Sequence, residues 1–364
     1  MILTAALILF AQADASVLSP EGRQAAERGL VVLAERQRSD GSWSGDVGYK
    51  TEDHYRAWNY DVPHLGVTAL AGMAFLAGGH VPGRGAYGDV VEKAVDSVIG
   101  QMQPNGYFQA HESRMYSHAF ATLFLAEACG MSENELLRPA LQKAVDLIVD
   151  SQNRDGGWRY TPYTEDADMS VSACQVMALR AARNIGLQVP RSTIDRAVKY
   201  VRDSAVRPGD RVPHMPWSDT PPRPGAFYYQ PLHATGNEGS RVTWPLTAAG
   251  VTILTHAGIH ADRDIDAGLD YLERYHERTN EVWGLTNQGH YYFWYGHYYA
   301  VQAFHMAGGE RYQRYFRELE RVLLRMQSAD GSWPNRTGPG SNYSTATACL
   351  LLQIPREYLP IFER

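Results

Sequence analysis

Two aspartates at the start of an apolar stretch are the side chains of this sequence best placed for acid chemistry. They lie in the segment 166–170, with the sequence DADMS, just before an apolar run over 171–182. A carboxylic acid that protonates an alkene must stay neutral until it acts, and burial beside a second carboxylate raises its pKa. Asp166 and Asp168 would also cap a helix well, because a carboxylate accepts hydrogen bonds from the N–H groups of a first turn. Both interpretations are open, and capping is the simpler one.

An aromatic run at residues 291–299 is the second candidate. Seven of its nine residues are Phe, Trp or Tyr, against 11% aromatic residues in the whole chain. At helical spacing about half of these rings would face one side, where they could line a cavity for an apolar chain, a sugar ring or a carbocation. The other rings must pack between helices, and core packing alone is the competing interpretation.

Histidines are the third candidate, because His64 and His118 stand at the starts of apolar segments and His297 lies in the aromatic run. If those segments are helices that begin at one rim, these histidines and Asp168 would approach one another. Such a cluster could perform acid–base chemistry or bind a metal. We predict neither a metal nor a cofactor. The predicted ligand-binding residues are His64, Tyr116, His118, Trp244, Tyr291, Trp294, Tyr295, His297 and Tyr298.

A repeated turn sets the framework for these residues. The pattern Gln-x-x-Asp-Gly-x-Trp occurs three times, a variant ends in Tyr-Phe, and two weaker copies contain only the glycine and the aromatic residue. In chain order the six copies lie at 37–43, 103–108, 152–158, 225–227, 282–284 and 327–333. Their aromatic residues are spaced by about 50 to 70 residues, which leaves room for two helices in each unit.

The segments between these turns alternate in character. One class is amphipathic, as in 137–148, where an apolar stripe faces a charged side, which is typical of solvent-facing helices. The other class is apolar nearly all round, which is typical of buried helices. Its members are 65–77, 120–129, 171–182, 246–254 and 346–352. Glycine follows several of these segments and provides the expected helix end.

The repeated turn resembles the repeat of squalene and hopene cyclases, which protein prenyltransferase β-subunits share more loosely. The resemblance extends over nearly the full chain. It implies an all-α fold, a single (α/α)6 toroid in which six inner and six outer helices surround a central cavity. Triterpene cyclases resemble two such barrels in one chain, whereas this sequence has the repeats of one. We therefore do not expect full triterpene cyclisation.

The same resemblance assigns roles to particular residues. The cyclases carry an Asp-x-Asp-Asp-Thr motif whose middle aspartate is the proton donor, which implies that role for Asp168 with Asp166 beside it. Met169 stands where that motif has a further aspartate. Prenyltransferases hold zinc through Asp, Cys and His, but the sequence contains no Asp-x-Cys pair. Their zinc site is therefore not transferred to this chain.

The rest of the sequence restricts location and partners. Residues 2–10 are apolar and small residues follow, which predicts a secretory signal over 1–15, export, and a toroid domain over 16–364. The net charge is −6, without a Lys/Arg cluster, so nucleic acid is not an expected partner. The Pro-, Gly- and aromatic-rich stretch 206–241 is either an ordered flap over the toroid mouth or a passive surface loop.

These observations predict an exported toroid that binds an apolar or isoprenoid molecule in its central cavity, and contact with a membrane surface is compatible with such a ligand. Two other functions stay open. One is an active cyclase-like enzyme that uses Asp168 as proton donor. The other is a toroid that binds carbohydrate or protein. The sequence determines neither catalysis nor oligomeric state.

Overall fold

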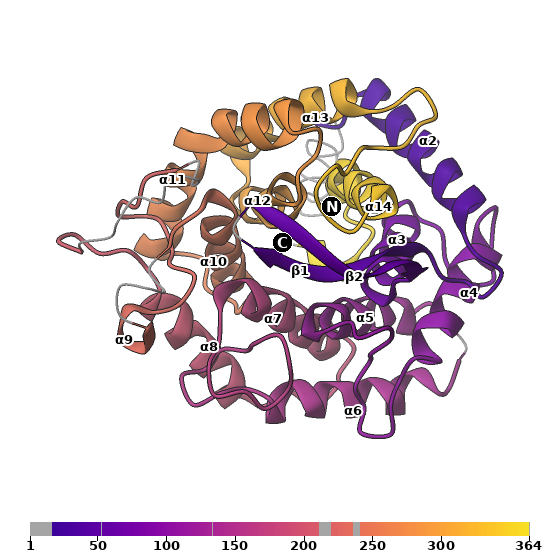
Figure 1. Cartoon of the computed structure of the whole chain (residues 1–364), viewed down its shortest axis with the longest axis horizontal. Helices are drawn as coiled ribbons and strands as arrows, with labels where there is room; N and C mark the ends of the chain where they lie inside the picture. The colour runs from indigo at the N-terminus through magenta and orange to yellow at the C-terminus, as the bar shows by residue number, and fades with distance from the viewer. Residues whose placement is uncertain (1–16, 52, 133, 211–219, 236–240, 364) are drawn as a thin grey trace, which may run out of the picture.

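Two concentric rings of helices form the molecule (Figure 1). The computed structural model describes residues 17–51, 53–132, 134–210, 220–235 and 241–363. The inner ring contains α3 (Leu65–Ala77), α5 (Met115–Cys129), α7 (Met169–Asn184), α10 (Trp244–His256), α12 (Tyr291–Ala307) and α14 (Ser341–Gln353). The outer ring contains α2 (Pro20–Arg36), α4 (Gly88–Ile99), α6 (Leu137–Asp150), α8 (Arg191–Asp203), α11 (Arg263–Thr279) and α13 (Gly309–Met326).

The inner ring is closed. Each inner helix packs against the next one, and α14 returns to pack against α3. In the outer ring α13 likewise contacts α2. The predicted all-α (α/α)6 toroid is therefore confirmed. The predicted signal at 1–15 lies outside the described residues and stays a prediction. None of the described helices is long and apolar enough to cross a membrane.

Burial explains why the two classes of helix differ in sequence. Every residue of α3 and of α10 is buried, whereas α13 buries a single face. Two inner helices begin five residues before the apolar segments predicted for them, at Met115 and Ser341. Their first turns carry polar side chains such as Ser117 and Ser344, which interrupt the apolar pattern although both are buried.

The tryptophan of each repeated turn joins an outer helix to an inner helix. Trp333 donates from its indole Nε1 to the carbonyl of Leu323 in the last turn of α13, at 2.8 Å. Its backbone N–H donates to Thr345 Oγ1 on α14, at 3.1 Å. Trp43 and Trp158 make the corresponding pairs of hydrogen bonds. A free carbonyl at a helix end is thereby satisfied inside the core.

The glutamine of each complete turn reaches the following outer helix. Gln327 donates from Nε2 to Gly331 O in its own turn and to Ala25 O on α2, both at 2.9 Å. Gln37 and Gln152 bridge to α4 and α8 in the same way. The glycine is required because it has a positive φ and lies against the backbone of that next helix. The contact from Gln327 to α2 joins the end of the chain to its beginning.

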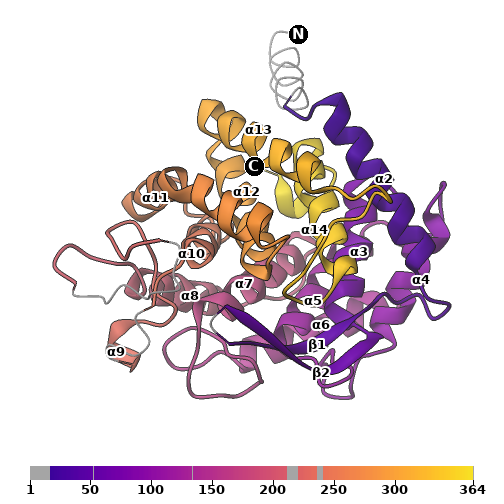
Figure 2. The same cartoon turned by 45° about the horizontal axis from the view of Figure 1, so that its top comes forward.

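A β-hairpin covers one end of the toroid. Strands β1 (Ser44–Thr51) and β2 (His54–Pro63) pair antiparallel and cross the central opening (Figures 1 and 2). The hairpin is anchored on both sides. Near its base, Asp46 N donates to Pro339 O at 2.9 Å, and at its turn His290 Nε2 donates to Asp53 O at 2.7 Å. The sequence did not predict these strands.

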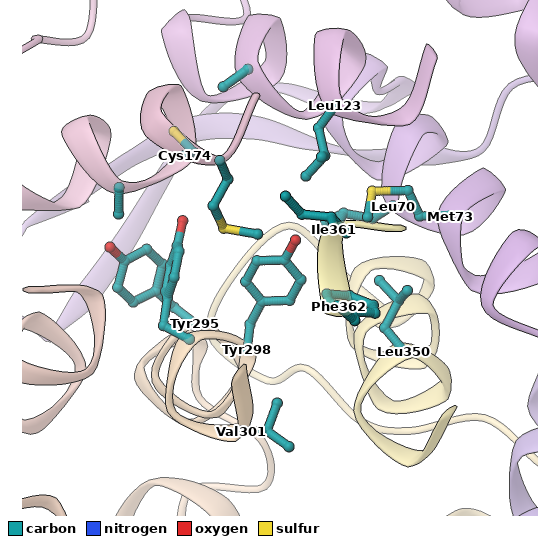
Figure 3. Packing of buried hydrophobic residues seen from close by; sticks show 14 of the residues in the cluster. Leu70, Met73, Leu123, Cys174, Tyr295, Tyr298, Val301, Leu350, Ile361 and Phe362 are labelled. Carbon is teal, nitrogen blue, oxygen red and sulfur yellow. The ribbon is translucent and has the colours of Figure 1, made fainter. Parts of the chain in front are cut away.

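The opposite end is filled by the C-terminal segment. Ile361 and Phe362, in the short helix η4 (Pro360–Phe362), lie at the centre of the ring beside Leu70 and Leu350 (Figure 3). The backbone N–H of Ile361 donates to Glu127 Oε2 on α5, at 3.4 Å. Burial raises the pKa of Glu127 to about 8, although the Ile361 N–H opposes that change. The shorter elements α9 (Leu232–Thr235), η2 (Asn280–Thr286) and η3 (Ile354–Arg356) complete the fold.

Gln327→Leu tests the closure of the ring. The substitution removes the three hydrogen bonds of the side-chain amide, to Ala25, Gly331 and Arg28, at similar volume, so we expect a loss of about 1–2 kcal/mol in the free energy of unfolding, measured by chemical denaturation. Gln103→Leu is the matched control, because among the described residues the exposed Gln103 amide bonds to the side chain of Gln109 alone. That control should cost less than about 0.5 kcal/mol. Equal losses would contradict the bracing role.

Glu127→Gln tests the buried carboxyl. Because the pKa of Glu127 is raised in the folded protein, its contribution to stability is complete below pH 4.5 and is lost as pH rises through about 8. We expect Glu127→Gln to melt about 2–4 °C higher than the wild type at pH 9 and to match it near pH 5. A difference in Tm that does not change with pH would show that Glu127 is not the titrating group.

Candidate functional site

A cavity of about 160 Å³ lies between the hairpin and the first turns of the inner helices. Its walls are mainly aromatic and aliphatic. They include Val47, Trp58, Leu70, Tyr116, Phe120 and Tyr298. Tyr295 and Tyr298 project from α12 toward the centre of the ring, beside Cys174 of α7 (Figure 3). The hairpin thus converts the open mouth of a toroid into a covered pocket, which we call the cavity.

The cavity continues into two further spaces. A groove of about 360 Å³ opens outward and shares Trp58, Glu112, Ser113 and Arg114 with the cavity. On the other side, an annex of about 40 Å³ shares Lys50, Tyr160 and Tyr295 with the cavity. The annex is also lined by Ser170, Tyr229, Arg241 and Thr243. The site therefore has an apolar middle with a polar space at each side.

Lys50 on β1 stands where the cavity and the annex meet. Its ammonium lies 4.7, 5.1 and 5.5 Å from the ring centres of Tyr295, Tyr291 and Tyr116. Burial lowers the pKa of Lys50 to about 8, and Arg241 adds to that effect while Asp168 opposes it. Sequence reasoning missed Lys50 because it missed the hairpin. The sequence offered one signal for Lys50, because it lies outside the predicted amphipathic segments and the other three lysines lie within them.

Asp168 caps α7, which confirms the capping interpretation. Its Oδ1 accepts hydrogen bonds from Val171 N at 2.9 Å and from Ser170 Oγ at 2.5 Å. Its Oδ2 accepts from Arg159 Nη1 at 2.8 Å and from Tyr229 OH at 3.1 Å. The carboxylate is fully buried and does not itself line the cavity. Proton donation by Asp168 stays a prediction.

Arg159 joins the two predicted aspartates. Its Nε lies 3.0 Å from Asp166 Oδ2, whose side chain is 56% exposed, and its Nη1 lies against the buried Asp168. Burial opposes the charge on Arg159, but Asp168 and Tyr229 outweigh that effect and raise its pKa. The two carboxylates therefore share a cation, and an acid role would have to act through this ion pair.

A short hydrogen-bonded chain connects Asp168 to the cavity. Tyr116, which lines the cavity, donates from its hydroxyl to Ser170 Oγ at 2.5 Å, and Ser170 donates to Asp168. The hydroxyls of Tyr160 and Tyr229 lie 2.6 Å apart beside the same carboxylate. Asp168 thus contacts two side chains that line the annex and is connected to the cavity through a second side chain.

The expected cluster of histidines with Asp168 does not form. His64 lines the cavity and caps α3, where its Nδ1 accepts from Val67 N at 3.2 Å. His118 instead points outward: its Nδ1 accepts from Phe108 N at 3.1 Å, and its Nε2 lies 3.2 Å from Ala144 O on α6. His118 therefore takes the place of the hydroxyl that accepts the backbone N–H of the tryptophan in the complete repeats.

His297 also faces the outer ring, with its Nδ1 2.7 Å from Tyr315 OH on α13. Burial lowers the pKa of His64 and His118 to about 4 and that of His297 to about 3, so all three are neutral at pH 7. Within the described ranges, the side chains that could hold a metal together are His276, Glu277 and Glu318, away from the cavity.

Two predicted tryptophans are likewise positioned outside the cavity. Trp244 donates from Nε1 to Leu272 O on α11 at 3.0 Å, and Trp294 donates to Gly289 O at 3.0 Å. Of the predicted set, the structure brings together His64, Tyr116, Tyr291, Tyr295 and Tyr298 around the cavity. Ligand binding by these residues stays a prediction.

The stretch 206–241 contributes to the annex rather than to the cavity. Phe227 serves as the aromatic residue of the fourth repeat and donates from its backbone N–H to Thr247 Oγ1 at 3.3 Å. Tyr229 and Arg241 line the annex. Residues 211–219 and 236–240 lie outside the described residues, so the flap stays a prediction there.

Comparison with known proteins supports the fold. No protein-family model and no curated protein matches the chain. The α-1,6-mannanase GH76A from a Salegentibacter species is 10% identical, with a TM-score of 0.59 over 93% of this chain and 99% of the mannanase. The type II terpene cyclase MstE from Scytonema is 14% identical, with a TM-score of 0.55 over 94% of this chain and 100% of the cyclase. At these identities the similarity establishes the α/α toroid and not a family.

Asp168→Asn tests the ion pair with Arg159. The substitution removes the charge that faces a largely buried guanidinium, so we expect a loss of about 2–4 kcal/mol in the free energy of unfolding. Asp166→Asn is the matched control because its carboxylate is more than half exposed, and it should cost less than about 1 kcal/mol. Chemical denaturation followed by circular dichroism measures both. Similar small losses would contradict the structural role of Asp168.

Proposed function

We propose that this toroid binds a small molecule with an apolar body in the cavity beneath the hairpin. The main support for this proposal is a covered pocket with aromatic walls. Two buried polar atoms of its lining residues, Trp58 Nε1 and Tyr298 OH, have no hydrogen-bond partner among the described residues. An unsatisfied buried polar group costs about 1–3 kcal/mol. A ligand that fills the cavity would supply apolar contact for the walls, and a polar group on that ligand would supply a partner for one of these atoms.

The size of the cavity limits the ligand. A cavity of about 150 Å³ is known to hold benzene, so about 160 Å³ suits a single ring or a short isoprenoid unit. A longer isoprenoid would have to extend along the groove or displace the hairpin. The dimensions therefore favour a small ligand over the long polyisoprenoid chains of triterpene chemistry.

The terpene cyclase MstE supports this direction, because it has been solved with geranylgeranyl dihydroxybenzoate as substrate. We nevertheless propose binding rather than cyclisation for this chain. Asp168 is a helix cap and the partner of Arg159, and it reaches the cavity through other side chains, Ser170 and Tyr116 on one path and Tyr229 and Tyr160 on another. The cyclase-like enzyme remains the alternative if turnover of a bound isoprenoid is detected.

Carbohydrate binding is the second candidate, and the groove favours it. Trp58 and Tyr107 line the groove together with the polar side chains of Gln109, Glu112 and Thr161, and aromatic rings beside hydrogen-bonding groups suit a sugar. The mannanase has been solved with α-1,6-mannotriose in an inactive variant in which two consecutive aspartates are replaced. This chain contains no two consecutive aspartates. We therefore restrict this candidate to sugar binding without hydrolysis.

We also propose that the protein is exported, because a secretory signal is predicted at residues 1–15. A protein outside the cytoplasm would meet its ligand in the cell envelope or the medium, and contact with a membrane surface would give access to lipids. Cell fractionation of the native host tests this part independently of ligand binding.

Val47→Trp tests the proposed ligand cavity. Val47 projects from β1 into the cavity wall, so an indole at this position should fill the space. We expect toluene and geraniol to raise the Tm of the wild type by about 2 °C or more and to leave Val47→Trp unchanged. Val31→Trp on α2 is the control, because Val31 is 44% exposed on the outer ring, and it should respond like the wild type.

Native mass spectrometry of the purified protein, with lipid extraction, complements these melting curves. A retained apolar compound that is absent from Val47→Trp would support the proposal. If neither probe shifts the Tm and nothing is retained, the cavity does not bind an apolar molecule. If α-1,6-mannotriose is the only one of these compounds that stabilises the protein, sugar binding in the groove is the better-supported function.

A further inference from the structure

The described residues that line the annex include two cations and no acidic side chain. Lys50 and Arg241 line it together with the hydroxyl-bearing Ser170 and Thr243. Within the described part of the chain, no carboxylate lies within ion-pairing distance of Lys50 or Arg241. Because both side chains are partly buried, their positive charges are only partly solvated.

Both cations rest on aromatic rings instead of carboxylates. The Arg241 guanidinium carbon lies 3.6 Å from the ring centre of Tyr229, and the Lys50 ammonium lies 4.7 Å from that of Tyr295. A cation–π contact holds a cation without occupying all of its N–H groups. These donors remain available to an incoming acceptor.

The nearest acid does not neutralise this pair. Asp168 favours the charged form of Lys50, but its two oxygens already accept hydrogen bonds from Arg159, Ser170, Tyr229 and the backbone of α7. Burial raises the pKa of the nearby thiol of Cys174, so that side chain is neutral at pH 7. The annex is therefore a positively charged space with donors on several sides.

We propose that the annex binds the carboxylate of the ligand whose apolar body fills the cavity, so that the ligand is a small amphiphilic acid. This inference rests on the proposed function and specifies its ligand class. The annex and the cavity share Lys50, Tyr160 and Tyr295, so a head group in one space is directly connected to a body in the other. The ammonium of Lys50 marks the junction.

The dimensions of the annex favour a carboxylate. A cavity needs about 10–15 Å³ to hold one buried water molecule. The annex, at about 40 Å³, therefore accommodates a group of roughly three oxygen-sized atoms. A carboxylate matches this size, whereas a phosphate ester is larger. An arene or a short alkyl chain attached to the carboxylate would occupy the aromatic-walled cavity. The ligand class is thus an aryl or short-chain carboxylic acid.

Benzoate and benzyl alcohol are matched probes, because they share the ring and differ in charge. We expect isothermal titration at pH 7 to give at least tenfold tighter binding of benzoate than of benzyl alcohol to the full chain. Lys50→Met should remove this preference and keep the binding of benzyl alcohol, which shows that the cavity is intact. Lys93→Met, at an exposed position on α4, is the control and should behave like the wild type. Phenyl phosphate should bind more weakly than benzoate.

A pH series separates charge from shape. The groups that act on Lys50 are Asp168, Arg241 and Cys174, and the rings around it are Tyr116, Tyr291 and Tyr295. Because the pKa of Lys50 is about 8, the affinity for benzoate should decline as pH rises from 7 to 10. The affinity for benzyl alcohol should stay constant over the same interval.

The possible outcomes distinguish the two proposals. If benzyl alcohol binds as tightly as benzoate, or if Lys50→Met keeps the preference, the acid-binding annex is wrong while the apolar cavity stands. If phenyl phosphate binds tighter than benzoate, the carboxylate assignment is wrong. If no probe binds, both the cavity and the annex proposals fail.

Discussion

Closure of the ring by one repeated hydrogen-bonded turn is the constraint on which the rest of the structure depends. Each complete turn satisfies a carbonyl at the end of an outer helix with an indole N–H, and its glutamine reaches the next outer helix. At the last copy that next helix is α2, so the two ends of the chain are joined. All inner helices then begin at the same rim, and their first turns gather under the hairpin. The candidate site is a consequence of this arrangement.

The sequence predicted the architecture because repeats and burial patterns depend on many residues at once. It predicted the site less well because a side chain's direction changes by about 100° with each helical residue. Tyr116 lines the cavity, whereas His118, two positions later, bonds to the outer ring. The same step separates Tyr295, which faces the cavity, from His297, which bonds to Tyr315. To predict which residues line the cavity, one must know which side of each inner helix faces the centre. The apolar inner segments do not reveal this, because they are apolar nearly all round.

The hairpin escaped prediction for a different reason. Its two strands carry an interrupted pairing register at Val47 and a mixture of exposed and half-buried residues, so no regular alternation marks them. Lys50, Trp58 and the cover of the cavity were missed with it. Asp168 shows the opposite case, because its position before an apolar run was sufficient to predict a cap. Its ion pair with Arg159 needed the folded turn that brings the two side chains together.

If an amphiphilic acid lies between the apolar cavity and the cationic annex, a crystal structure with bound 4-bromobenzoate will locate both of its ends. The bromine is located by its anomalous signal and the carboxylate by its density. We expect the bromine inside the cavity near Leu70 and Tyr298, and the carboxylate between Lys50 and Arg241. Bromine found only in the outer groove or on the surface, with an empty annex, would contradict this expectation.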